Sequence, residues 1–232
     1  MHYACHPVIH HGNAITADFP GALCADLEQS TAPVAMYLQG CSGDINPDRY
    51  SPDGSYRDGD QRDVEEMGQH LADLVRRSLP QARQSPAAVH LRRSRVALPL
   101  QPRLSATELR RTAETNGVCG EWAQLMLEAP HRFEREPSLD LVRVDLARDL
   151  HLLGMPAEPV SRFALHAKKV SGNTSLAMGY TDGMTTYLFS PDQHAEGGYE
   201  PDQAPFYLGM PAALTPSSQE PILAAITALA GR

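Results

Sequence analysis

The side chains best suited to chemistry lie beside apolar segments, at places where the strands of an α/β sheet would end. His6 directly precedes Pro7 in the segment YACHP, and Glu158 follows the apolar stretch LHLLGMPA. Tyr187 and Tyr199 border a polar, glycine-containing loop (YLFSPDQHAEGGYE). Ligand and catalytic groups collect at strand ends in α/β sheets. An imidazole, a carboxylate and a phenol from distant segments could therefore converge on one zinc ion, which accepts nitrogen and oxygen ligands. The alternative is that they are ordinary polar loop residues.

Other short motifs give little support for a different chemistry. The sequence has no HExxH, GxSxG or P-loop motif, and no GxGxxG segment followed by a helix. His10 and His11 are adjacent and could bind a cation, although a histidine without a matched partner is the commoner case. The loop after the apolar segment PVAMYL contains Gly43, Asp44 and Asn46 (GCSGDINPD), which adds polar groups at another strand end.

Predicted strands and helices interleave along the chain, which indicates an α/β fold with a mixed β-sheet core and flanking helices. Apolar residues recur at three- and four-residue steps over residues 64–79 and predict a helix that ends at a proline. Ser105 and Glu108 form a capping-box pattern that opens a helical insertion near residues 100–135. We interpret residues 1–232 as a single domain that contains this insertion. The other predicted elements are strands at 33–40, 89–100, 141–146, 150–154 and 175–179, helices at 21–29, 161–169 and 221–229, and long polar loops at 43–61 and 181–200.

The composition is that of a folded, acidic protein. Its 232 residues include 20 Lys and Arg against 28 Asp and Glu, and the net charge of −8 argues against nucleic-acid binding, which needs a basic surface. No apolar run is long enough to span a bilayer as a transmembrane segment. The first 20 residues lack the basic start and apolar stretch of a signal peptide, so the chain as written is expected in the cytoplasm. Four scattered cysteines without a CxxC pair predict free thiols.

Four segments, in order along the chain, share a pattern with a known family. They are HYACHPVIHHGNAITADFPG, YLQGCSGDINPD, GMPAEP and GYTDGMTTYLFSPDQHAEGGYE. They resemble the neutral/alkaline (non-lysosomal) ceramidase family, especially its bacterial relatives. The resemblance covers residues 1–48 and 150–200 and is weak between them. It implies a ceramidase-like catalytic domain, a zinc-dependent amidase that hydrolyses the N-acyl bond of ceramide, a sphingolipid; many members are secreted or periplasmic.

The resemblance also implies roles for individual residues. His6, Glu158 and Tyr187 match zinc ligands of the family, and Tyr199 matches an active-site tyrosine that positions or polarises the scissile carbonyl. Zinc polarises a carbonyl and activates water, and a nearby phenol can donate to the developing oxyanion. The implied cofactor is Zn2+, and the implied partner is a small-molecule or lipid-like amide substrate.

Two departures from the family pattern change this expectation. The family's other zinc-binding histidine, in an upstream HTHSGP-type segment, has no match here, so the chain resembles the C-terminal portion of a longer catalytic domain and is expected to bind zinc weakly. Asn46 takes the place of the presumed nucleophilic serine of GDVSPN, and an amide cannot serve as that nucleophile. We predict that Asn46 is a catalytic group that orients water or a carbonyl, with Gly43 and Asp44 binding substrate. The alternative is that Asp44 and Asn46 cap a turn.

Together these observations predict a hydrolase that cleaves an amide bond by a zinc-bound water, without a covalent acyl-enzyme. One alternative is a truncated or degenerate relative that binds a ligand and is catalytically inactive. Another is an enzyme completed by a second chain that supplies the missing histidine. A domain without its first strands would expose apolar sheet edges, which favours association into a homo-oligomer or poor solubility.

Overall fold

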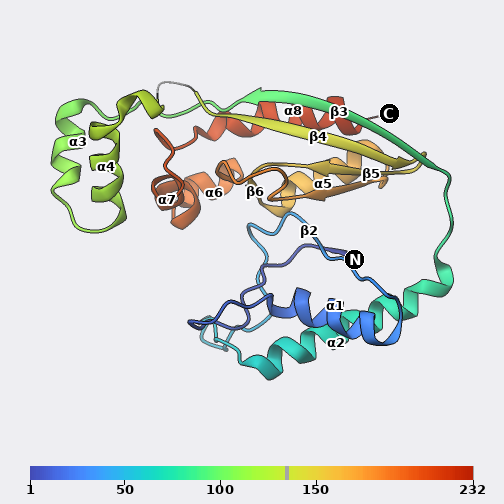
Figure 1. The fold of residues 1–232 in the computed structure, drawn as a ribbon. Coiled ribbons are helices and arrows are strands. Elements are labelled where there is room, and N and C mark those ends of the chain that lie inside the picture. Colours follow the sequence, from blue (N-terminus) through green and yellow to red (C-terminus); the bar gives the residue numbers. More distant parts are fainter. Residues whose placement is uncertain (134–135, 232) are drawn as a thin grey trace.

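The computed structural model describes residues 1–133 and 136–231 and has the mixed α/β architecture predicted from the sequence (Figure 1). The strands are β1 (His2–Tyr3), β2 (Leu38–Gln39), β3 (Ala87–Ala97), β4 (Ser138–Ala147), β5 (Leu150–Gly154), β6 (Glu158–Pro159), β7 (Ser175–Met178) and β8 (Tyr187–Leu188). The α-helices are α1 (Asp18–Ser30), α2 (Gln61–Ser78), α3 (Ala106–Ala113), α4 (Val118–Glu128), α5 (Ser161–Ser171), α6 (Pro191–Glu196), α7 (Ala204–Tyr207) and α8 (Gln219–Ala230), and a π-helical turn, η3, spans Tyr199–Gln203.

A mixed four-stranded sheet, in the order β3-β4-β5-β7, forms the centre of the upper layer in Figure 1. Its first three strands are antiparallel, whereas β5 and β7 are parallel. Side chains alternate between the two faces of a strand, and the fully buried Leu139, Leu141 and Leu153 lie in one core with Phe163 of α5 and Ile226 of α8. Because α8 contacts β3 and β4 while α5 contacts β7, these two helices cover that face of the sheet.

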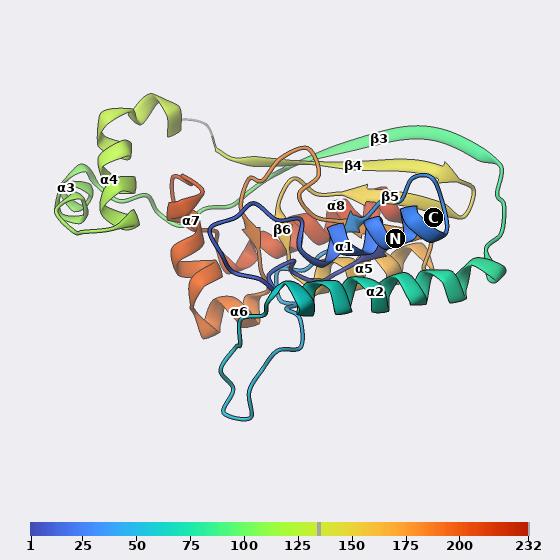
Figure 2. The ribbon, with the colours of Figure 1, turned by 60° about the horizontal axis from the view of Figure 1, so that its bottom comes forward.

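Helices α1 and α2 form a second layer, with the short parallel pair β1-β2 (Figures 1 and 2). The helix predicted at 64–79 is confirmed as α2, and Asp60 and Asp63 form a capping box at its start. Phe19, Leu23 and Leu71 contribute to the core of this layer. None of the helices in the described part of the chain is long and apolar enough to cross a membrane. All four cysteines are free, as predicted.

Helices α3 and α4 lie between β3 and β4 in the sequence and project from one end of the molecule (Figure 1). The capping box predicted from Ser105 and Glu108 is present at the start of α3. Trp122 of α4 donates from its indole N–H to the Met210 carbonyl (2.8 Å) and packs against Phe206. The predicted insertion near 100–135 extends over residues 134–135, which lie outside the described residues.

Two local predictions differ from the structure. The apolar segment 33–40 forms a strand only at Leu38–Gln39, and the side chains of Val34 and Met36 are exposed (73% and 66%). Its partner β1 is only two residues long, so the rest of the segment has no strand to pair with. The polar segment 181–200, predicted as a loop, contains strand β8 and helix α6.

His151 on β5 makes the stability of this fold sensitive to pH. It is 3% exposed, and burial, with a smaller contribution from Arg143, lowers the pKa of its imidazole from the ordinary value of 6.5. Below about pH 6.5 the imidazole therefore binds a proton more readily in the unfolded chain than in the native state. The contribution of the neutral, buried His151 to stability is fully present above about pH 6.5 and is lost as the pH falls towards the lowered native pKa.

When the pH is lowered from about 7.5 to 5, we expect the melting temperature of the His151→Gln variant to fall by less than that of the wild type. Thermal unfolding followed by circular dichroism measures this difference. His70→Gln, which changes an exposed histidine, should retain the wild-type pH dependence. An equally steep loss in His151→Gln would contradict the prediction.

Candidate functional site

The structure brings His6 and Glu158 together from opposite halves of the chain. His6 Nε2 lies 3.1 Å from Glu158 Oε1, and Glu158 is buried, with 5% of its surface exposed. The approach is not aligned as a hydrogen bond, since Glu158 Oε1 has no hydrogen-bond partner among the described residues. Two ligands of a tetrahedral zinc ion, at roughly 2.1 Å each, would lie about 3.4 Å apart. The observed 3.1 Å is a normal ion-pair distance and is also close to the spacing of two groups that share one metal ion.

The loop of residues 41–47 fixes the backbone beneath this pair. The His6 amide donates to the Ile45 carbonyl (2.8 Å), and the Gly43 amide donates to the Pro159 carbonyl (3.0 Å). A Cβ atom at Gly43 would lie 3.2 Å from backbone atoms of Pro159 and Val160. The absence of a side chain at Gly43 lets the loop approach β6 closely. One of the two hydrogen bonds therefore ties the loop to the segment that carries His6, and the other ties it to the strand that carries Glu158.

Tyr187 enters the site through strand pairing. Strands β6 and β8 are parallel, and Glu158 and Tyr187 are directly paired residues. The Tyr187 side chain interacts with the Glu158 carboxylate, and burial, followed by this interaction, raises the pKa of the phenol. Tyr199 of η3 lies next to it, with ring centroids 5.9 Å apart at 86°, and is 44% exposed. The structure thus places Tyr187 beside Glu158 in the paired strands and the more exposed Tyr199 next to Tyr187.

The chemistry of this donor set suits zinc. An imidazole nitrogen, a carboxylate oxygen and a phenol oxygen are all zinc ligands of ordinary kinds, and the unpaired buried oxygen of Glu158 would gain a partner from a cation. Within residues 1–133 and 136–231, no group of three or more His, Cys, Asp or Glu side chains could hold a metal ion. The candidate centre therefore depends on the phenol as its third donor. His10 and His11 bond separately to Gly59 and Asp58.

The comparison with solved structures covers almost the whole chain. Neutral ceramidase from Pseudomonas aeruginosa matches 99% of the chain with a TM-score of 0.67 at 18% sequence identity, and the match spans 43% of that enzyme's chain. The chain has the fold of part of neutral ceramidase. A ceramidase complexed with C2 gives a TM-score of 0.66 at 14% identity, over 99% of this chain and 44% of the other. No protein-family pattern and no curated protein sequence matches.

The ceramidase resemblance also singled out Asp44 and Asn46, which occupy different surroundings. Asp44 accepts hydrogen bonds from the Ser161 amide (2.6 Å) and hydroxyl (2.8 Å). Its charge therefore lies at the N-terminus of α5, where the helix dipole favours an anion. Asn46 is exposed, and its amide donates to the Tyr50 hydroxyl (3.4 Å). Asp44 thus anchors the helix that follows β6, and substrate contacts of Asp44, Asn46 and Gly43 stay predictions.

Tyr180 and Ser42 are two site residues that the sequence analysis missed. Burial, followed by the nearby Glu158 carboxylate, raises the pKa of the Tyr180 phenol, and Ser42 is fully buried. The available signal in the sequence is a large aromatic residue inside the turn-forming segment GYTDG.

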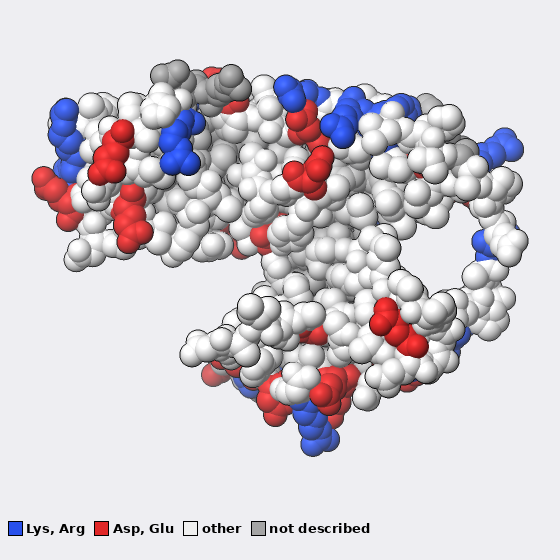
Figure 3. All heavy atoms as spheres, in the orientation of Figure 1, with Lys and Arg blue, Asp and Glu red and all other residues white. Residues whose placement is uncertain are grey.

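The surface near the tyrosines is recessed. Figure 3 shows the molecule hollowed between the α3–α4 pair and the α1–α2 layer, and α7, which carries Tyr207, lies beside this recess in Figure 1. The ring of Tyr207 is 59% exposed and lies 5.9 Å from that of Tyr199. A row of tyrosine rings therefore leads from Glu158 to the surface.

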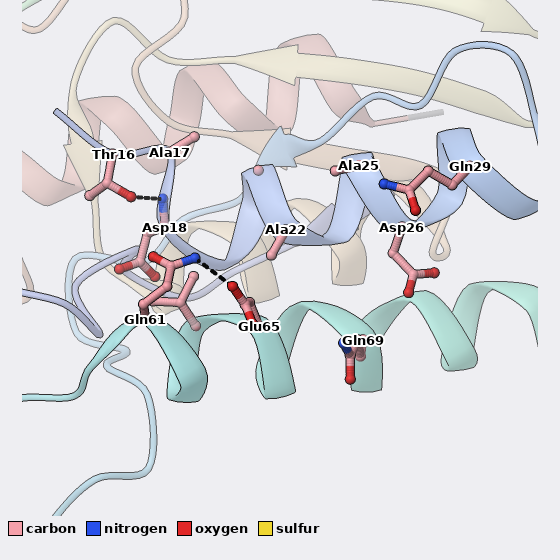
Figure 4. A pocket seen from close by; sticks show the side chains of 12 residues that line it. Thr16, Ala17, Asp18, Ala22, Ala25, Asp26, Gln29, Gln61, Glu65 and Gln69 are labelled. Atoms are coloured by element: carbon pink, nitrogen blue, oxygen red, sulfur yellow. Dashed lines mark hydrogen bonds between the residues drawn. The ribbon is translucent and has the colours of Figure 1, made fainter.

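A separate hollow of about 440 Å³ lies between α1 and α2 (Figure 4). The small residues Gly21, Ala22 and Ala25 line it together with the acidic Asp26 and Glu65. None of the predicted site residues lines this hollow. It is distinct from the candidate centre.

Proposed function

We propose that this chain forms part of a zinc-dependent amidohydrolase that cleaves an N-acyl (amide) bond, with His6, Glu158 and Tyr187 as metal ligands. The observation that carries the proposal is the buried Glu158 Oε1, which lies 3.1 Å from His6 Nε2 and has no hydrogen-bond partner among the described residues. The similarity in fold to neutral ceramidase supports it. An amide substrate with a lipid-like acyl group suits the row of tyrosine rings beside the centre.

The residues of this chain have separate tasks in the reaction. When bound, zinc supplies Lewis-acid polarisation of the amide carbonyl and activation of water. Burial raises the pKa of Tyr199, so its phenol stays protonated at neutral pH and can donate to the carbonyl oxygen as negative charge develops there. Asn46 has an amide donor and an acceptor but no ionisable nucleophile, so it can orient a reactant without forming an acyl-enzyme.

A second candidate function is a ligand-binding relative without catalysis. Asn46 in the serine position of the family favours it. The chain spans less than half the length of the ceramidases that it resembles. Completion of the site by a second chain, and association into a homo-oligomer, stay predictions.

Hydrolysis of a panel of N-acyl amides by the purified chain, with and without added zinc, tests the proposed function. We expect zinc-dependent release of the amine, and we expect Asn46→Ala to raise the barrier by about 1–3 kcal/mol, the cost of an unpaired hydrogen-bond partner. Asp48→Ala, an exposed neighbour in the same loop, should have wild-type activity. Zinc binding without hydrolysis would favour the non-catalytic alternative, and a trapped acylated residue would contradict the mechanism.

A further inference from the structure

The central sheet carries apolar side chains on both of its faces. On one face, Leu153 lies in the core that includes Phe163 of α5 and Ile226 of α8. On the opposite face, a row of directly paired apolar residues crosses all four strands, and it consists of Leu91, Val144, Leu152 and Leu176. Because side chains alternate between the two faces of a strand, this row points away from α5 and α8. We call these four residues the open sheet face.

The burial of alternating residues shows that the open sheet face is incompletely covered. Leu153 and Ala177, on the face covered by the helices, are 0% and 1% exposed. Leu91 is 55% exposed, and the other three residues of the row remain partly exposed. None of the four belongs to a hydrophobic core among the described residues. A group of exposed apolar side chains on one surface marks an interaction site.

The occupant of the open sheet face must offer a flat apolar layer. A sheet that is apolar on both faces is covered by a further layer on each side, and a second sheet packs about 10 Å away. In the two solved ceramidases, the part that matches this chain is 43% and 44% of the whole, so more than half of each protein is available for such a layer. A second copy of this chain is a poorer occupant, because each copy has a net charge of −8 and the two would repel each other.

We propose that the open sheet face binds a separate polypeptide that supplies the remaining layers of a ceramidase-like fold. An apolar layer of this partner packs on the row from Leu91 to Leu176, and the burial of these side chains drives the association. The inference concerns the fold and goes beyond the proposed function, since it does not depend on the zinc centre.

Co-expression with a defined probe tests the inference, with the full chain carrying an affinity tag. The probe is the part of neutral ceramidase from Pseudomonas aeruginosa that lies outside the match with this chain. We expect a complex of one chain with one probe, measured by light scattering of the co-purified material. Leu91→Asp should reduce the amount of co-purified probe at least about 10-fold, because it would bury a charge without a partner in the interface.

A second leucine provides the matched control. Leu165 of α5 is 63% exposed and lies outside the open sheet face, so Leu165→Asp should retain the probe as the wild type does. Both substitutions change exposed positions, and both variants should melt close to the wild type, which separates lost binding from lost folding.

Three outcomes would overturn the inference. The probe could fail to co-purify with the wild-type chain, whether it is soluble or not, or it could bind Leu91→Asp as well as the wild type. The chain alone could form a stable dimer that Leu91→Asp dissociates, which would show that a second copy covers the face. Zinc affinity is measured on the chain alone, so these outcomes leave the proposed function standing, and a chain that binds no zinc leaves this inference standing.

Discussion

The Glu158→Gln variant should bind zinc at least about 100-fold more weakly than the wild type, a loss of about 2.7 kcal/mol. The change removes the only carboxylate among the proposed ligands while it keeps the size of the side chain. Competition with a chromophoric chelator measures the affinity. The size of the effect reflects both the lost charge of the ligand and the weaker donor strength of an amide oxygen.

The same substitution should have the opposite effect on stability without metal. Glu158 is 5% exposed, and its Oε1 has no hydrogen-bond partner among the described residues, so the metal-free chain keeps one carboxylate oxygen buried without a hydrogen bond. A neutral glutamine avoids that cost, and we expect the melting temperature in the presence of a chelator to stay equal or rise. This combination of weaker zinc binding and unchanged or higher stability is typical of a functional group. Substitution of a purely structural residue would lower both the zinc affinity and the melting temperature.

A surface carboxylate provides the control for Glu158→Gln. Asp192 is highly exposed and pairs with Arg162 (3.0 Å), so Asp192→Asn should change neither zinc affinity nor melting temperature measurably. Wild-type zinc affinity in Glu158→Gln would show that any bound zinc occupies another place, such as the histidines His10 and His11, and would remove the candidate centre.

The sequence offers candidate residues but says nothing of their surroundings. The ceramidase resemblance implies His6, Glu158 and Tyr187, and in the structure His6 Nε2 lies 3.1 Å from Glu158 Oε1 while Glu158 pairs with Tyr187 in neighbouring strands. The place of Tyr180 next to the segment that leads to Glu158 could not be predicted, because it depends on a left-handed turn held by hydrogen bonds to residues 155–157. Such long-range backbone contacts leave no periodic pattern in the sequence.

The fold shows the same division between local and long-range information. Helix α2 follows from apolar spacing and a terminal cap, both of which are local. The apolar run at 33–40 looked like a buried strand, but strand length depends on the partner, and β1 offers only two residues. Helix α6 begins at a capping box formed by Ser190 and Gln193, a local pattern that is visible in the sequence.

The other large effect concerns the helix that follows the candidate ligand. Phe163 of α5 is fully buried in the main core, two residues beyond Ser161, whose amide and hydroxyl bond to Asp44. We expect Phe163→Ala to lower the free energy of unfolding by about 3–5 kcal/mol, through lost burial and the cavity left behind.

Denaturant unfolding of this variant should show a lower midpoint with an unchanged slope. Leu165→Ala changes a residue of the same helix that is 63% exposed, so its effect should stay within about 0.5 kcal/mol. Since α5 starts directly after β6, its packing on the sheet also holds the strand that carries Glu158. A loss below about 1 kcal/mol in Phe163→Ala would mean that the core relaxes around the substitution, and that α5 contributes little to the rigidity of the candidate centre.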